Sequence, residues 1–196
     1  IMGKTKEMTV AAMLDNPVYK DRNALYALQP PAGFVHRTQQ KNELVVELAP
    51  ILMNSPVTGV FVYGNPGTGK TSLILDLVKE LEQEAKKRNV KLRTAYVNCS
   101  ENRTETAILI ELLHQLTPGQ AYPRMGWNRA KALEEFQAVL SKEKMHTLAI
   151  LDEVDYVLKE EGDDILYRLS RIPAAHVSTV IISNDIRVSD YIKPRT

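Results

Sequence analysis

The chain has 196 residues, and at about 150 residues per domain this length predicts one compact domain with a short additional segment. Apolar residues make up 44% of the sequence and charged residues 25%, a composition that excludes a disordered or collagen-like chain. The basic residues number 25 and the acidic residues 24, which leaves a formal net charge of +1. A global positive field that would hold nucleic acid is therefore excluded, and any such binding must be local or come from outside this chain.

Two features of the sequence bear on the cellular location. No apolar run approaches the roughly 18 residues that a membrane span needs, and the N-terminus lacks the charged-then-apolar pattern of a signal peptide. The single cysteine, Cys99, has no internal disulfide partner, which agrees with a reducing compartment. We therefore expect a cytoplasmic protein without a membrane partner.

The chain divides into a strap and a core. Residues 1–36 are predicted to form an N-terminal strap, because Pro30 and Pro31 favour extended backbone without regular pairing. The core is expected over residues 37–196. Its first element is a helix over residues 37–49, which we expect to stop near Pro50.

Strands and helices alternate through the core. Short apolar, β-branched runs predict four strands, at residues 58–63, 92–98, 147–151 and 177–183. Helical periodicity follows at residues 74–85, 109–116 and 133–140, so that two helices fall between the second and third strands. This alternation predicts an α/β fold in three layers, with a parallel sheet covered by helices on both faces.

A phosphate-binding loop is predicted between the first strand and the helix that follows it. The segment from Gly64 to Thr71 matches the GxxxxGK[ST] pattern at every fixed position. Its glycines permit backbone angles that turn N–H groups inward, and the next helix points its N-terminal dipole at the same place. We expect the nucleotide-binding residues to be Gly64, Asn65, Pro66, Gly67, Thr68, Gly69, Lys70, Thr71 and Ser72. Within this set, Lys70 is expected to reach the β- and γ-phosphates.

Acidic residues end the third strand, where ligands of open α/β sheets bind. Asp152 is expected to hold Mg²⁺ together with the Thr71 hydroxyl. Glu153 is placed to orient or deprotonate an attacking water, and we predict it as a catalytic residue. Asp155 is interpreted as a surface or capping residue.

An asparagine ends the fourth strand. Its neutral amide suits a γ-phosphate sensor, because it bonds both a phosphate oxygen and a water, and we predict Asn184 as the second catalytic residue. Taken alone, the segment Ser183-Asn184-Asp185 is equally compatible with an ordinary turn.

With these motifs in this order, the sequence resembles the AAA+ ATPases, and more narrowly the archaeal replication initiators related to the origin recognition complex and the cell-division-control loader. The similarity extends over nearly the whole chain. The stretches that carry it are 19–22, 34–37, 64–71, 96–99, 123–127, 151–155, 162–167 and 182–185.

The resemblance implies a P-loop NTPase that uses ATP or ADP with Mg²⁺. It further implies that Val35, His36 and Arg37 lie close to adenine, and that an initiator-type helical insertion falls at about residues 118–141. The implied partners are duplex origin DNA, the replicative helicase and other initiator subunits. Family members carry a fifth strand, a helical lid and a DNA-gripping C-terminal winged helix, none of which we expect within this chain. It is therefore expected to hydrolyse ATP slowly or not at all and to bind DNA weakly.

The resemblance also implies a sheet order in which the fourth strand lies beside the first. Without a fifth strand, the first strand becomes an unprotected edge, and we expect a marginally stable or self-associating chain. The same order places Asn184 between the phosphate loop and Asp152.

Two other functions fit the phosphate loop. One is a P-loop kinase, which needs an acceptor pocket and arginines over the transferred phosphate. The other is a signalling ATPase of the nucleotide-switch type, in which no DNA is involved.

Overall fold

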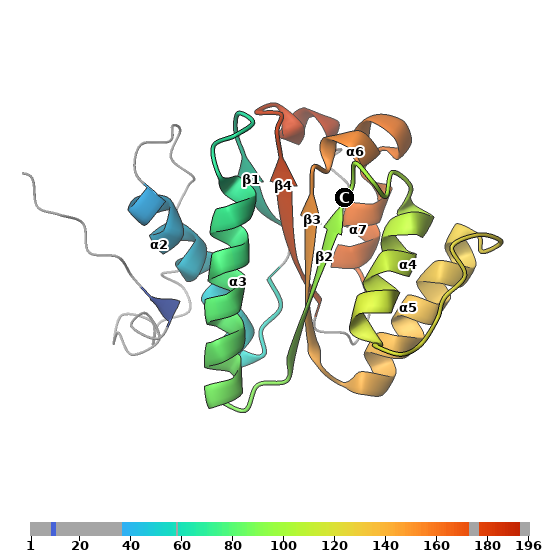
Figure 1. Ribbon diagram of the computed structural model, residues 1–196, viewed down its shortest axis with the longest axis horizontal. Helices are drawn as coiled ribbons and strands as arrows, with labels where there is room; N and C mark the ends of the chain where they lie inside the picture. Colours follow the sequence, from blue (N-terminus) through green and yellow to red (C-terminus); the bar gives the residue numbers. More distant parts are fainter. Residues whose placement is uncertain (1–8, 11–36, 58, 173–176, 193–196) are drawn as a thin grey trace, which may run out of the picture.

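The computed structural model describes residues 9–10, 37–57, 59–172 and 177–192. Its centre is a four-stranded parallel sheet in the order β1-β4-β3-β2 (Figure 1). The strands are β1 (Val60–Tyr63), β2 (Leu92–Asn98), β3 (His146–Asp152) and β4 (Val177–Ser183). The predicted parallel α/β fold is confirmed, and β1 and β2 are the two edges of the described sheet.

Two strands differ in length from the prediction. The first strand begins at Val60 instead of residue 58, because Gly59 has a φ of 76° and does not continue the extended backbone. The third strand is longer by one residue at each end. The N–H of His146 donates to the carbonyl of Lys91 at 2.8 Å, which extends the pairing with β2.

One face of the sheet is covered by α2 (Arg37–Leu48), the 3-10 helix η3 (Ala49–Met53) and α3 (Lys70–Lys87) (Figure 1). The expected stop of the α-helix near Pro50 is confirmed, since α2 ends at Leu48. Pro50 lies in the first turn of η3, where a missing N–H costs little. The chain continues after Leu48 as a 3-10 helix. This helix ends at Asn54, whose backbone is left-handed.

The opposite face is covered by helices that follow β2, β3 and β4 in the sequence. They are α4 (Glu105–Leu116), α5 (Arg129–Glu143), α6 (Asp155–Glu161), α7 (Asp164–Ser170) and the 3-10 helix η4 (Val188–Tyr191). Both helices predicted between the second and third strands are present. Side-chain caps fix where they begin, since Thr104 accepts from the third residue of α4 and Asn128 from the third residue of α5.

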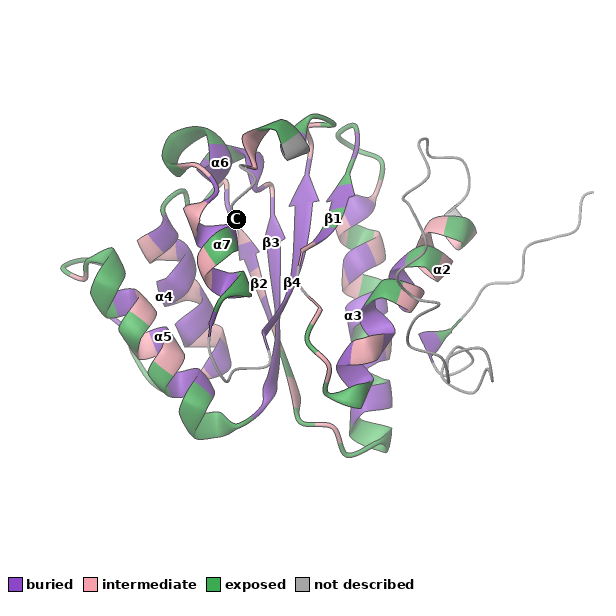
Figure 2. Ribbon diagram, turned by 180° about the vertical axis from the view of Figure 1, so that it is seen from behind, coloured by how far each residue is buried: buried purple, intermediate pink, exposed green. Residues whose placement is uncertain are grey.

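The two central strands, β3 and β4, are buried at every position (Figure 2). Their side chains alternate between two apolar clusters, one under α3 and one under α4 and α7. Because all four strands run parallel, their carboxyl ends meet at one edge of the sheet. The polar residues that follow the strands therefore gather there. Across the described parts of the chain, no helix has the length and apolar character that a membrane crossing requires.

Candidate nucleotide-binding site

The loop between β1 and α3 has the backbone conformation predicted for a phosphate loop. Gly67 and Gly69 are both left-handed, with φ values of 75° and 78°, and Gly69 is the N-cap of α3. Residues other than glycine rarely adopt this backbone conformation. The first N–H groups of an α-helix have no partner within the helix, so the start of α3 presents donors to an anion.

Lys70, the first residue of α3, folds back over this loop. Its side chain is buried, and its Nζ donates to the carbonyls of Gly64 and Asn65, both at 2.9 Å, and to Oδ1 of Asn184 at 2.8 Å. Burial lowers the pKa of Lys70, while the carboxylate of Asp152 opposes the shift. The predicted proximity of Asn184 to the phosphate loop is thereby confirmed.

Asp152 and Thr71 lie side by side at the start of α3. The Thr71 hydroxyl donates to Oδ2 of Asp152 at 2.7 Å, and Asp152 is only 5% exposed. A hydroxyl and a carboxylate are hard oxygen ligands, and Mg²⁺ takes one or two such protein ligands together with phosphate oxygens and waters. The pair fits Mg²⁺ in this mode. Elsewhere among the described residues, no group of three or more His, Cys, Asp or Glu side chains is arranged to hold a metal.

Tyr96 also contacts Asp152. Its hydroxyl, on β2, donates to the same oxygen, Oδ2, at 2.8 Å. Burial raises the pKa of Tyr96, and the hydrogen bond to Asp152 raises it further, so the phenol stays a neutral donor. No role for Tyr96 was predicted from the sequence. Its signals were its place near the carboxyl end of a strand next to β3 and its place in the stretch 96–99, which carries the family resemblance.

Glu153 follows Asp152 with an unusual backbone. Its φ is 52°, in the left-handed region that residues with a side chain seldom occupy, and its N–H donates to Oδ1 of Asp152 at 2.8 Å. Such a conformation costs of order 1–3 kcal/mol and is concentrated at functional sites. The side chain is half-buried at the edge where the strands end.

Asp155 is not a surface or capping residue, as the sequence had suggested. It is 8% exposed, and one carboxylate accepts both the Ser183 hydroxyl and, at 3.1 Å, the N–H of Asn184. A backbone hydrogen bond joins the same two segments, since the N–H of Val154 donates to the carbonyl of Ile182 at 3.1 Å. Asp155 therefore fixes the end of β4 against the start of α6, and with it the position of Asn184.

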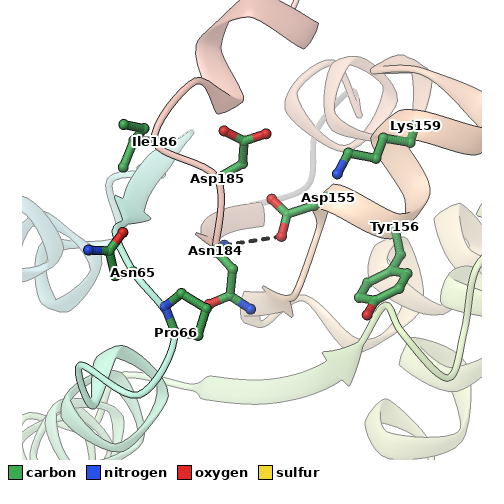
Figure 3. Close-up of a pocket in the computed structure, with 8 residues that line it drawn as sticks. All are labelled: Asn65, Pro66, Asp155, Tyr156, Lys159, Asn184, Asp185 and Ile186. Carbon is green, nitrogen blue, oxygen red and sulfur yellow. Dashed lines mark hydrogen bonds between the residues drawn. The ribbon is translucent and has the colours of Figure 1, made fainter.

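A cleft of about 500 Å³ opens beside these residues (Figure 3). Asn65 and Pro66 of the phosphate loop form one wall, and Tyr156 of α6 forms the opposite side. Asn184 and Asp155 lie between them, joined by the hydrogen bond described above (Figure 3). The cleft is thus continuous with the place where Lys70 meets Asn184.

The sequence is similar to a known family over most of this fold. A family model described as AAA domain matches residues 57–184, well over half of the chain. The chain belongs to the AAA domain family. An ORC1-type DNA replication protein of Thermococcus onnurineus is 34% identical over 184 residues, which cover 91% of this AAA domain chain and 44% of that protein. One from Methanosphaera stadtmanae is also 34% identical and covers 84% and 43%. The chain therefore spans less than half the length of these curated relatives.

Solved structures support the same assignment. The ORC1 protein of Aeropyrum pernix, solved in complex with DNA, has a TM-score of 0.74 and 28% identity, over 90% of this AAA domain chain and 46% of that chain. The ORC2 protein of Aeropyrum pernix, solved as ADPNP–ADP complexes, has a TM-score of 0.66 and 25% identity, over 88% and 47%.

The remaining predicted residues divide into two groups. In the AAA domain loop, the Thr68 hydroxyl donates to the carbonyl of Asn65 at 2.9 Å, and Ser72 lies in the first turn of α3. Val35 and His36 lie outside the described residues, and Arg37 is described only as the first residue of α2. The role of the strap next to adenine stays a prediction.

Proposed function

We propose that this AAA domain binds ATP with Mg²⁺ and hydrolyses it slowly, as the switch module of a DNA replication initiator. The observation that carries the proposal is the convergence of three groups at the start of α3. There the Lys70 ammonium, the Thr71 hydroxyl and the Asp152 carboxylate meet beside the left-handed glycine loop. A cation, a hard-ligand pair and a set of backbone donors are together suited to a polyphosphate and its metal.

The phosphates would be held from the loop side. The N–H groups of the loop and of the first turn of α3 donate to phosphate oxygens, and Lys70 exchanges a carbonyl partner for one of them. Thr71 and Asp152 would hold the metal, which when bound neutralises charge on the β- and γ-phosphates. Because Lys70 contacts Asn184, we infer that the Asn184 amide senses the γ-phosphate.

The hydrolytic step would depend on Glu153. We infer that its carboxylate orients or deprotonates the attacking water, and that the strained backbone at φ 52° presents it at the sheet edge. Slow hydrolysis suits a switch, in which ATP and ADP stabilise different arrangements of a protein and its partners.

The replication role comes from the relatives. The similar curated proteins are named ORC1-type DNA replication proteins, and the ORC1 structure contains DNA. We propose by this similarity that the natural protein acts with duplex DNA and other initiator subunits. Recognition of origins, loading of the replicative helicase, or both are the finer parts of the proposal. The similarity favours an initiator over a P-loop kinase or a signalling ATPase.

Glu153→Gln tests the proposed chemistry. The amide keeps the size of the side chain but removes the base, so we expect calorimetric ATP affinity within about twofold of wild type and a fall in turnover of about 100-fold or more. Turnover is measured as phosphate release from the natural full-length protein. The control is Glu160→Gln, an exposed glutamate of α6 paired with Arg103 at 3.6 Å.

Two results would contradict the proposal. Unchanged turnover in Glu153→Gln removes this residue from the catalytic role. Absence of binding heat with both ATP and ADP in the wild-type protein overturns the nucleotide site itself.

A further inference from the structure

We propose that Tyr96 is a positioning residue for Asp152, and that its hydroxyl sets the strength with which the site holds Mg²⁺ next to a nucleotide. This inference rests on the proposed function. It adds a residue from β2, the edge strand farthest from the phosphate loop, to a site otherwise built from the ends of β1, β3 and β4.

The Asp152 carboxylate is fixed by three donors from three different parts of the chain. Its Oδ2 accepts from Thr71 at 2.7 Å and from Tyr96 at 2.8 Å, and its Oδ1 accepts from its neighbour's N–H at 2.8 Å. Thr71 is itself a predicted metal ligand. If its hydroxyl oxygen turns toward a metal, Tyr96 is the side-chain donor that still defines the orientation of Oδ2.

Tyr96 is itself held firmly from outside the sheet. Its N–H donates to Oε1 of Gln115 at 2.8 Å, and Nε2 of Gln115 donates back to its carbonyl at 2.7 Å. These are the two bonds that a further strand would make. The Gln115 side chain, from α4, thus replaces a neighbouring strand at this one residue of the edge and fixes the backbone from which the Tyr96 side chain reaches Asp152.

Hydrogen-bonding partners of a metal-binding carboxylate tune its affinity. Removing such a partner typically weakens metal binding or activity by 10–100-fold, although the partner does not touch the metal. A residue that only packed would act differently, because its loss would lower stability without altering the dependence of nucleotide binding on metal.

Tyr96→Phe separates these two roles, because it removes the hydroxyl and keeps the ring. The measurement is calorimetric affinity for ADPNP in EDTA and in a fixed excess of Mg²⁺. We expect affinity in EDTA within about twofold of wild type and a loss of about tenfold in the gain that Mg²⁺ provides. The matched control is Tyr122→Phe, which removes another partly enclosed hydroxyl, one that accepts from Thr117 at 3.0 Å and has no bond to Asp152.

Each outcome decides the inference. An unchanged gain from Mg²⁺ in Tyr96→Phe, with or without a lower melting temperature, overturns the positioning role while leaving the proposed function intact. An equal loss in EDTA and in Mg²⁺ also overturns it, because the hydroxyl would then act on nucleotide binding in general. If wild type binds no ADPNP in either condition, the proposed function fails first and this inference fails with it.

Discussion

β1 and β2 are both edge strands of the sheet, but the outer sides of the two strands differ. At β1, Phe61 and Tyr63 are 36% and 39% exposed, and in the described chain no strand pairs along the outer side. At β2, the backbone of Tyr96 is closed off by Gln115. The unpaired backbone N–H and C=O groups of an edge strand can pair with a strand of another chain. The β1 edge is therefore open to association, whereas the β2 edge is covered at Tyr96 by the Gln115 side chain.

The two edge strands contribute differently to the site. β1 leads directly into the phosphate loop, whereas β2 contacts the Asp152 carboxylate through the Tyr96 hydroxyl. We expect the β1 side to provide nucleotide affinity itself and the β2 side to adjust its dependence on metal.

The largest expected effect is at the end of β1. Lys70→Ala removes a buried cation, and charge-assisted hydrogen bonds are worth about 1.5–3 kcal/mol each, so we expect ADPNP affinity to fall about 100-fold or more. Calorimetry measures it. Lys79→Ala, an exposed lysine on the same helix, should bind normally. If Lys70→Ala lowers ADPNP affinity no more than Tyr96→Phe does, the proposed difference between the β1 and β2 sides of the site is wrong.

An intermediate effect is expected at the β2 edge. Gln115→Ala leaves the N–H and carbonyl of Tyr96 without their partners, and we expect the free energy of unfolding to fall by about 1–3 kcal/mol. Urea denaturation measures this change. Gln83→Ala, on the exposed side of α3, is the control and should stay within about 0.5 kcal/mol of wild type. Equal stability of the two variants would show that the amide does not protect the edge.

The smallest effect is expected at the β1 edge. We expect the chain to self-associate at high concentration, and Phe61→Glu to weaken that association several-fold by placing a charge on the exposed face of β1. Sedimentation velocity over a concentration series measures it. Met125→Glu, at an 89% exposed residue between α4 and α5, should associate as wild type does. A monodisperse wild-type monomer at high concentration would contradict the expectation.

Local features of the sequence were sufficient for most of the fold and for the centre of the site. Strand and helix periodicities predicted the four described strands and the helices α2, α3, α4 and α5, because burial on a parallel sheet imposes a repeat that is readable within a few residues. The phosphate loop was equally readable, since Gly67 and Gly69 meet a local backbone requirement. Lys70, Thr71, Asp152 and Asn184 were expected at one site, and the structure joins Lys70 to Asn184 and Thr71 to Asp152 by hydrogen bonds.

The sequence by itself determined the four strands, most of the helices and the polar residues that follow the strands, because those depend on neighbours in the chain. Only the tertiary structure decided the contacts of Asp155 and Tyr96. Asp155 meets Asn184 across 29 residues, and Tyr96 meets Asp152 across 56. Such contacts exist only after β2, β3 and β4 have taken their places side by side. An acidic residue after a strand and a tyrosine within one look alike in a sequence whether they face solvent or complete a site.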